Sequence, residues 1–212
     1  MGSLEYWDDK GNNLSILYEL FDSWNNVLNE YDNAWGKYVA PHVYIQQTQV
    51  GYLAVAARDV GWLPQLEFSI ERRTNKREFV KGRCDLALWC KNKKRETELF
   101  FEVETCTYSV KINEQQIKEL ITLFEATKEN VRHIREARGS PAIAVVLVRL
   151  CNASLDDVAS DLWARLRKIR RRLRSDFCAL NIRGRQCMER TPIEWGGDCL
   201  GIAAFGSIKG HL

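Results

Sequence analysis

Apolar residues recur at helical spacing in the first third of the chain. Over residues 14–31 they fall three and four positions apart, which predicts an amphipathic helix. A second stretch of the same character covers residues 38–62 and is broken by Gly51. We therefore expect a mainly helical N-terminal portion over residues 1–62.

From Leu63 onward the spacing of apolar residues changes from helical to alternating, as in a β-strand. Polar segments rich in Lys, Arg and Asn separate three such stretches, each of which predicts a strand: residues 66–70, 79–90 and 98–106. Strands that follow one another with short turns usually pair, so we expect an antiparallel meander.

A long helix is predicted after the meander. Asn113 and Gln116 have the spacing of a capping box, and apolar residues follow at helical intervals up to Gly139. The next segment, residues 142–150, is almost continuously apolar, which is typical of a strand buried on both faces.

The C-terminal third predicts one more helix and two strands. Ser154 resembles a helix start, a basic stretch continues to Arg174, and the strand candidates are residues 177–183 and 199–207. The chain is thus predicted to be an α/β protein with a mixed central sheet flanked by helices. It forms one domain over residues 1–212, divided into a helical portion (1–62), a core (63–150) and a C-terminal part (151–212).

Composition supports a globular protein. Hydrophobic residues make up 45% of the 212 residues and only four are proline, which argues against a disordered chain. The longest uncharged apolar run, residues 142–148, is far shorter than the ~20 residues that cross a bilayer. We expect a cytoplasmic protein without a membrane partner. The seven cysteines include no Cys-x-x-Cys pair, so we expect reduced thiols and no structural zinc site.

Carboxylates in the meander are candidates for metal binding. Side chains alternate along residues 98–106, so Glu98, Glu102 and Glu104 share one face. Asp85 lies in an otherwise apolar strand, where a carboxylate is costly unless it is paired, hydrogen-bonded or bound to a metal. Mg²⁺ or Mn²⁺ would relieve the repulsion among Asp85, Glu102 and Glu104, and we expect these three to be its ligands.

A solvated strand face explains the same glutamates in another way. Lys and Arg residues in the turn at 91–95 could form cross-strand ion pairs with them. We accept this explanation for Glu98. For the combination of Asp85, Glu102 and Glu104 the metal site is favoured.

These carboxylates and their surroundings resemble the core of the PD-(D/E)XK, or restriction-endonuclease-like, nuclease superfamily. The resemblance covers about residues 47–150. It rests on Gly82-Arg-Cys-Asp85, a turn, Phe101-Glu-Val-Glu104, a helix and an apolar strand, with a helix, a glycine and a first strand upstream. It implies a metal-dependent nuclease in which Asp85 is the metal-binding aspartate and Glu102 fills the acidic (D/E) position.

Glu104 stands where that family has lysine. The resemblance implies that this position orients or activates the attacking water, which a carboxylate could do as a base or through a second metal. Lys111 and Lys118, near the start of the following helix, are alternative sources of the lysine. The expected catalytic set is Asp85, Glu102, Glu104 and Lys111, and a catalytically inactive member of the family stays open.

The basic stretch before residue 175 predicts a surface that binds nucleic acid. An apolar stripe of Leu162, Leu166, Ile169 and Leu173 fits core packing, whereas residues 165–174 hold seven cations and no acidic residue. A membrane-surface helix has a similar composition but no other support in the chain. The cations expected to contact phosphates are Arg165, Arg167, Lys168, Arg170, Arg171, Arg172 and Arg174.

Taken together, the residues and the resemblance predict a Mg²⁺- or Mn²⁺-dependent nuclease that hydrolyses phosphodiester bonds. DNA is favoured over RNA as the substrate, and the resemblance implies a setting in antiviral defence or DNA processing. The alternative is an inactive nuclease-like domain that binds nucleic acid or a partner protein. A homodimer and a place in a larger complex are both left open.

Overall fold

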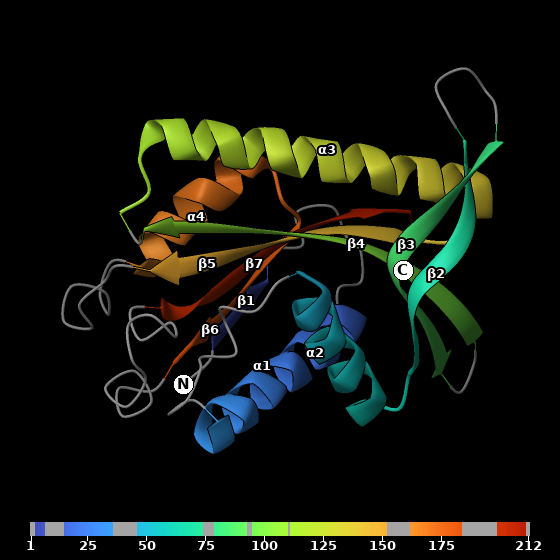
Figure 1. Cartoon of the computed structure of the whole chain (residues 1–212), viewed down its shortest axis with the longest axis horizontal. Coiled ribbons are helices and arrows are strands. Elements are labelled where there is room, and N and C mark those ends of the chain that lie inside the picture. Colours follow the sequence, from blue (N-terminus) through green and yellow to red (C-terminus); the bar gives the residue numbers. More distant parts are fainter. Residues whose placement is uncertain are drawn as a thin grey trace.

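The computed structural model contains one mixed sheet with helices on both of its faces (Figure 1). It describes residues 3–6, 15–35, 46–73, 79–92, 95–109, 111–151, 162–183 and 199–210. Within these residues the sheet has seven strands in the order β1-β6-β7-β5-β4-β3-β2. The strands are β1 (Ser3–Tyr6), β2 (Leu63–Arg73), β3 (Phe79–Asn92), β4 (Arg95–Ser109), β5 (Ala142–Cys151), β6 (Phe177–Ile182) and β7 (Cys199–Lys209).

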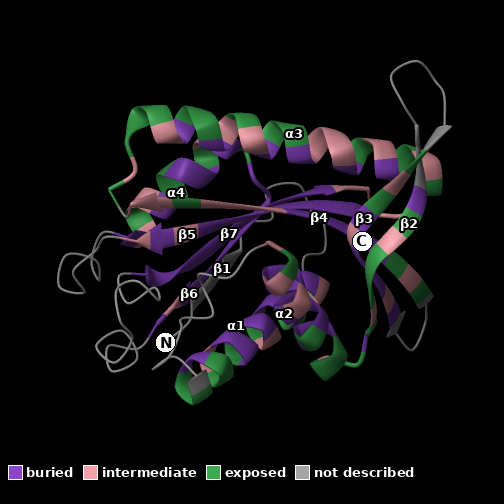
Figure 2. Ribbon diagram, in the orientation of Figure 1, coloured by how far each residue is buried: buried purple, intermediate pink, exposed green. Residues whose placement is uncertain are grey.

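The helices form two layers. They are α1 (Ser15–Trp35), α2 (Gln46–Asp59), α3 (Glu114–Arg138) and α4 (Leu162–Leu173). Helices α1 and α2 cover one face of the sheet, called here the α2 face, and α3 and α4 cover the other, the α3 face (Figure 1). Figure 2 shows that β5, β7 and the sheet-facing sides of the helices are buried, so each face holds its own apolar core.

The central strands have the expected connections. β2, β3 and β4 form an antiparallel meander. α3 then crosses the α3 face and leads into β5, which pairs parallel to β4. The α/β class with a mixed, helix-flanked sheet is therefore confirmed.

Helix α3 begins and ends where its sequence signals stand. The Asn113 side chain accepts a hydrogen bond from the Gln116 amide, and the Gln116 side chain accepts one from the Asn113 amide. Gly139 ends the helix with φ of 74°, a left-handed conformation that favours glycine. These caps fix Lys111 and Glu114 at the beginning of a long, rigid element.

Strand β5 is the centre of the sheet, as its apolar sequence predicts. Residues 142–148 are all buried, because β4 and β7 flank the strand and helices cover both faces. The predicted apolar stripe of α4 is also buried, with Leu166 and Leu173 each 1% exposed.

The structure differs from the predicted elements at Gly51 and at the N-terminus. α2 runs through Gly51, where open space surrounds the position of a Cβ, and a single glycine inside a helix costs only about 1 kcal/mol. Strand β1 was not predicted, since its four residues form a strand only by pairing with β6. The helix start expected at Ser154, and residues 38–45 of the second helical stretch, lie outside the described residues.

None of the six cysteines that the structure describes forms a disulfide. Among the described helices, none is long and apolar enough to cross a membrane.

Candidate functional site

Asp85 lies where β3 and β4 stop pairing. The last paired residues of the two strands are Leu86 and Phe101. Beyond them, the Asp85 carboxylate accepts a hydrogen bond of 2.8 Å from the amide of Val103, and the Gln46 side chain donates to the Val103 carbonyl. The Gln46 amide nitrogen also lies 3.5 Å from Asp85 Oδ2. Two side chains thus satisfy backbone groups of β4 that would otherwise lose their partner strand.

A cavity of about 250 Å³ opens beside Asp85 on the α2 face. Glu67 lies on its wall with φ of 46°, an unusual value for a residue other than glycine, and forms an exposed ion pair of 2.8 Å with Arg83. Asp85 and Glu67 are therefore two carboxylates that border one cavity. The residues that line it are Gln46, Gln47, Val50, Leu66, Glu67, Arg83 and Asp85.

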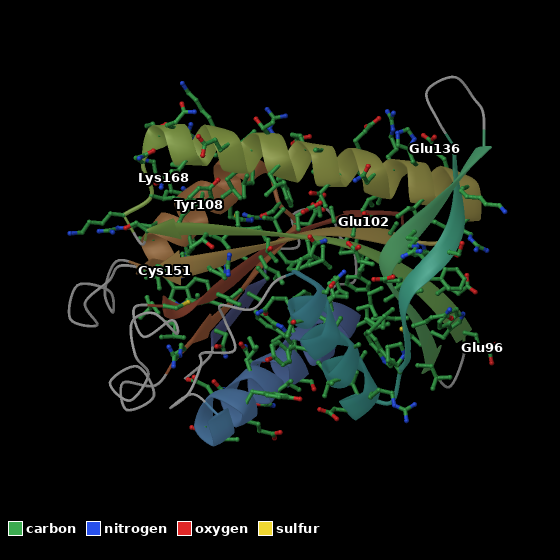
Figure 3. The ribbon with its side chains drawn as sticks, in the orientation of Figure 1. Glu96, Glu102, Tyr108, Glu136, Cys151 and Lys168 are labelled. Atoms are coloured by element: carbon green, nitrogen blue, oxygen red, sulfur yellow. The ribbon has the colours of Figure 1, made fainter. Side chains whose placement is uncertain are left out.

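Glu102 and Glu104 lie on the α3 face of the sheet. Their neighbours Phe101 and Val103 belong to the core beneath α1 and α2, whereas Phe100 packs beneath α3. Since side chains alternate along β4, the two glutamates share the face of Phe100. Glu102 is only 7% exposed and lies near the middle of the sheet, beneath α3 in Figure 3.

The carboxylates and the thiol of Cys84 influence one another. Burial, reinforced by the negative charge of Asp85, raises the pKa of the Glu104 carboxyl. Burial, with a further contribution from the Glu102 charge, raises the pKa of the Cys84 thiol to about 12. The centre of the meander therefore disfavours additional negative charge.

The metal site predicted at Asp85, Glu102 and Glu104 stays a prediction. Asp85 borders the α2 face, whereas Glu102 and Glu104 project toward α3. Across the part of the chain that the structure describes, there is no group of three or more His, Cys, Asp or Glu side chains placed to hold a metal ion. Gln46 and Arg83, which line the same cavity as Asp85, were not predicted as site residues, because nothing in their local sequence pattern indicates this position.

The cations of α4 divide into exposed and structural ones. Arg167, Lys168 and Arg171 are exposed. Arg170, which we expected to bind nucleic acid, is only 9% exposed, and its Nε donates a hydrogen bond of 3.1 Å to the carbonyl of Ser175. Arg170 therefore holds the turn that ends α4, because the chain folds back there toward β6. Exposed Arg174 occupies the left-handed region at this turn, with φ of 52°.

The exposed cations of α4, Arg167, Lys168 and Arg171, together with the adjoining start of α3, are called here the basic surface. Arg172 of α4 and Glu114 of α3 form an ion pair of 2.6 Å although they are 58 residues apart. The pKa of Glu114 lies below its usual range, mainly because Arg172 donates a hydrogen bond to its carboxylate. The positive charges of Lys168 and Lys118 contribute to the same effect. One carboxylate therefore faces several cations.

A second cavity, of about 350 Å³, lies between α3 and α4, and we call it the basic pocket. Lys111, expected as a catalytic lysine, lines this pocket and is absent from the described lining of the Asp85 cavity. Figure 3 shows Lys168 at the same end of the molecule, where α4 meets the start of α3. The residues that line the basic pocket are Lys111, Ile112, Glu114, Ile117, Arg165, Lys168 and Ile169.

No protein-family model matches this chain, and no curated protein matches its sequence.

Proposed function

We propose that this protein binds nucleic acid by its phosphate backbone, through the exposed cations of α4 and the adjoining start of α3. The observation that carries the proposal is the gathering of Lys111, Arg165 and Lys168 around a pocket whose described lining residues include a single carboxylate, Glu114. That carboxylate is already paired with Arg172. The excess positive charge at this surface suits a polyanion.

Phosphate neutralisation by Lys and Arg supplies most of the affinity in sequence-independent nucleic-acid binding. Cations on a helix whose opposite side is anchored in the core keep their spacing, since Leu166 and Ile169 fix α4 on the sheet. DNA is favoured over RNA because the family resemblance implies a role in DNA processing.

The direct test is to titrate labelled duplex DNA, single-stranded DNA and RNA with the protein in EDTA, at several salt concentrations. We expect the logarithm of the association constant to fall linearly with the logarithm of the salt concentration, by about 0.9 for each duplex phosphate contacted. The proposal is wrong if the protein shows no binding at about 50 mM salt, where electrostatic binding is strong.

Metal-dependent cleavage of phosphodiester bonds is a second candidate function. It is favoured by Asp85 and Glu67, two carboxylates on one cavity at the point where β3 and β4 separate. Mg²⁺ is commonly bound by one or two carboxylates together with phosphate oxygens of the substrate. The order of elements from α2 to β5 adds support through the family resemblance.

Cleavage would be tested on plasmid, single-stranded DNA and RNA with Mg²⁺, with Mn²⁺ and with EDTA. If this cavity is the active site, we expect cleavage with a metal, none with EDTA, and a loss of at least about 100-fold in Asp85→Asn and Glu67→Gln, on the scale of other essential catalytic groups. The asparagine keeps an acceptor for the Val103 amide, so the fold should survive.

Glu98→Gln provides the matched control, because it makes the same change on the other face of the meander, where Glu98 accepts a hydrogen bond from Trp89. Cleavage at the normal rate in Asp85→Asn would mean that Asp85 serves only to bridge the two strands. Absence of cleavage by the unaltered protein with either metal would exclude this second candidate.

A further inference from the structure

The basic pocket differs from a surface that only follows a phosphate backbone, because its walls are of two kinds. Ile112, Ile117 and Ile169 form apolar walls, and Lys111, Arg165 and Lys168 bring positive charge to the same cavity. Binding to the phosphate backbone of a nucleic acid requires exposed cations but does not require a concave apolar wall. The combination suits a ligand with an apolar ring system and an anionic group.

The size of the pocket agrees with one nucleotide. Its volume of about 350 Å³ lies in the range of roughly 300–1,000 Å³ in which proteins bind small molecules and cofactors. A base and sugar could lie against the isoleucine side chains while a phosphate meets the cations. Because the site is a pocket, a nucleotide at the end of a strand would enter it more easily than one within a continuous strand.

Charge favours a terminal phosphate over an internal one. A phosphate monoester carries about −1.5 to −2 charges at pH 7, whereas each internal phosphodiester carries one. Besides the three cations that line the pocket, Lys118 and Arg172 act on Glu114, the acidic residue among its described lining residues. A carboxylate oxygen of Glu114 lies 2.6 Å from the Arg172 guanidinium. A phosphate oxygen at the same position would accept the same charge-assisted hydrogen bond.

We propose that the basic pocket binds the terminal nucleotide of a strand that ends in a phosphate monoester, and that this phosphate displaces Glu114 from Arg172. The inference rests on the proposed nucleic-acid binding and adds to it a preference for one kind of strand end. Glu114 then acts as an internal competitor for Arg172, which the terminal phosphate must displace.

The experiment compares the affinities of four oligonucleotides of one sequence, in EDTA: with a 5′-phosphate, with a 3′-phosphate, with hydroxyl groups at both ends, and closed into a circle. We expect one of the two phosphorylated forms to bind at least about tenfold more tightly than the hydroxyl form, since a terminal phosphate can accept additional charge-assisted hydrogen bonds from the cations of the pocket. The circle should bind no better than the hydroxyl form.

Variants connect this preference to the pocket. Arg165→Gln and Lys168→Gln should each reduce the ratio between phosphorylated and hydroxyl ends, whereas Glu114→Gln should raise the affinity for the phosphorylated end. Glu119→Gln is the matched control, because it removes a carboxylate from the same helix outside the pocket, where Glu119 accepts a hydrogen bond from Gln115. Glu114 and Glu119 are both exposed, so neither change should lower the melting temperature appreciably.

Equal affinity for all four oligonucleotides, with the usual dependence on salt, would overturn the pocket proposal and leave backbone binding in place. An end preference that is unchanged in Arg165→Gln and Lys168→Gln would also overturn it, because the end would then bind elsewhere. Failure of all four to bind would instead contradict the proposed function itself.

Discussion

Reversal of two α4 charges, Lys168→Glu together with Arg171→Glu, is expected to weaken nucleic-acid binding by about 100-fold at low salt. Both side chains are exposed and belong to the surface for which nucleic-acid binding is proposed. A hydrogen bond to a charged group contributes about 1.5–3 kcal/mol, and each 1.4 kcal/mol is about a factor of ten in affinity. The slope of the salt dependence should also become shallower by about 0.9 for each duplex phosphate that the variant no longer neutralises. Fluorescence anisotropy across a salt series measures both effects.

The matched control changes the same amount of charge elsewhere. Arg58→Glu together with Arg132→Glu alters two exposed arginines, one at the end of α2 on the opposite face of the sheet and one near the far end of α3. If the basic surface binds the nucleic acid, this control should retain most of the affinity. Equal reductions in affinity in the two double variants would mean that only net charge matters and that α4 is not a specific binding surface.

Replacement of Asp32 by alanine is expected to lower the free energy of unfolding by about 3–5 kcal/mol, the usual cost of removing one partner from a buried ion pair. Asp32 of α1 lies 2.9 Å from Arg183, at the end of β6, and the two side chains are 5% and 0% exposed. Arg183 also donates to the carbonyl of Cys199 in β7. Without Asp32, the guanidinium stays buried beside α1 with its charge uncompensated. Urea unfolding followed by circular dichroism measures the change.

A double variant separates removal of the charge pair from a general packing defect. Asp32→Leu with Arg183→Met removes both charges and keeps apolar volume, and such exchanges of a buried ion pair are often neutral or stabilising. We expect the double variant to be more stable than Asp32→Ala. If both variants are destabilised equally, the pair contributes through packing of α1 against β6 and the charge argument fails.

The local order of elements could be predicted because it depends on neighbouring residues. Asn113, Gln116 and Gly139 define the ends of α3 by hydrogen bonds and backbone conformation within a few residues. The two-residue alternation of β4 likewise places Glu102 and Glu104 on one face, as the structure has them. Strand β1 was missed because four residues carry too weak a pattern, and its pairing with β6 supplies the missing hydrogen bonds.

The candidate sites depended on contacts between distant segments. Periodicity relates side chains within one strand, but it does not decide whether Asp85 and Glu102 lie on the same face of the sheet, since that depends on where the pairing of β3 and β4 ends. The sequence also gives Arg170 the same character as its basic neighbours, and only the turn at Ser175 makes it a buried structural residue.

The α/β class, the meander, the capped helix and the strongly basic helix are all encoded in local spacing and composition, so the amino-acid sequence alone specified them. Which charges meet was settled only by tertiary packing. The crossover through α3 and the return through β5 bring Glu114 and Lys111 to Arg165, Lys168 and Arg172, and no local pattern encodes that meeting. A side chain's distant partners depend on how the sheet and helices pack against one another, and that packing is a property of the whole chain.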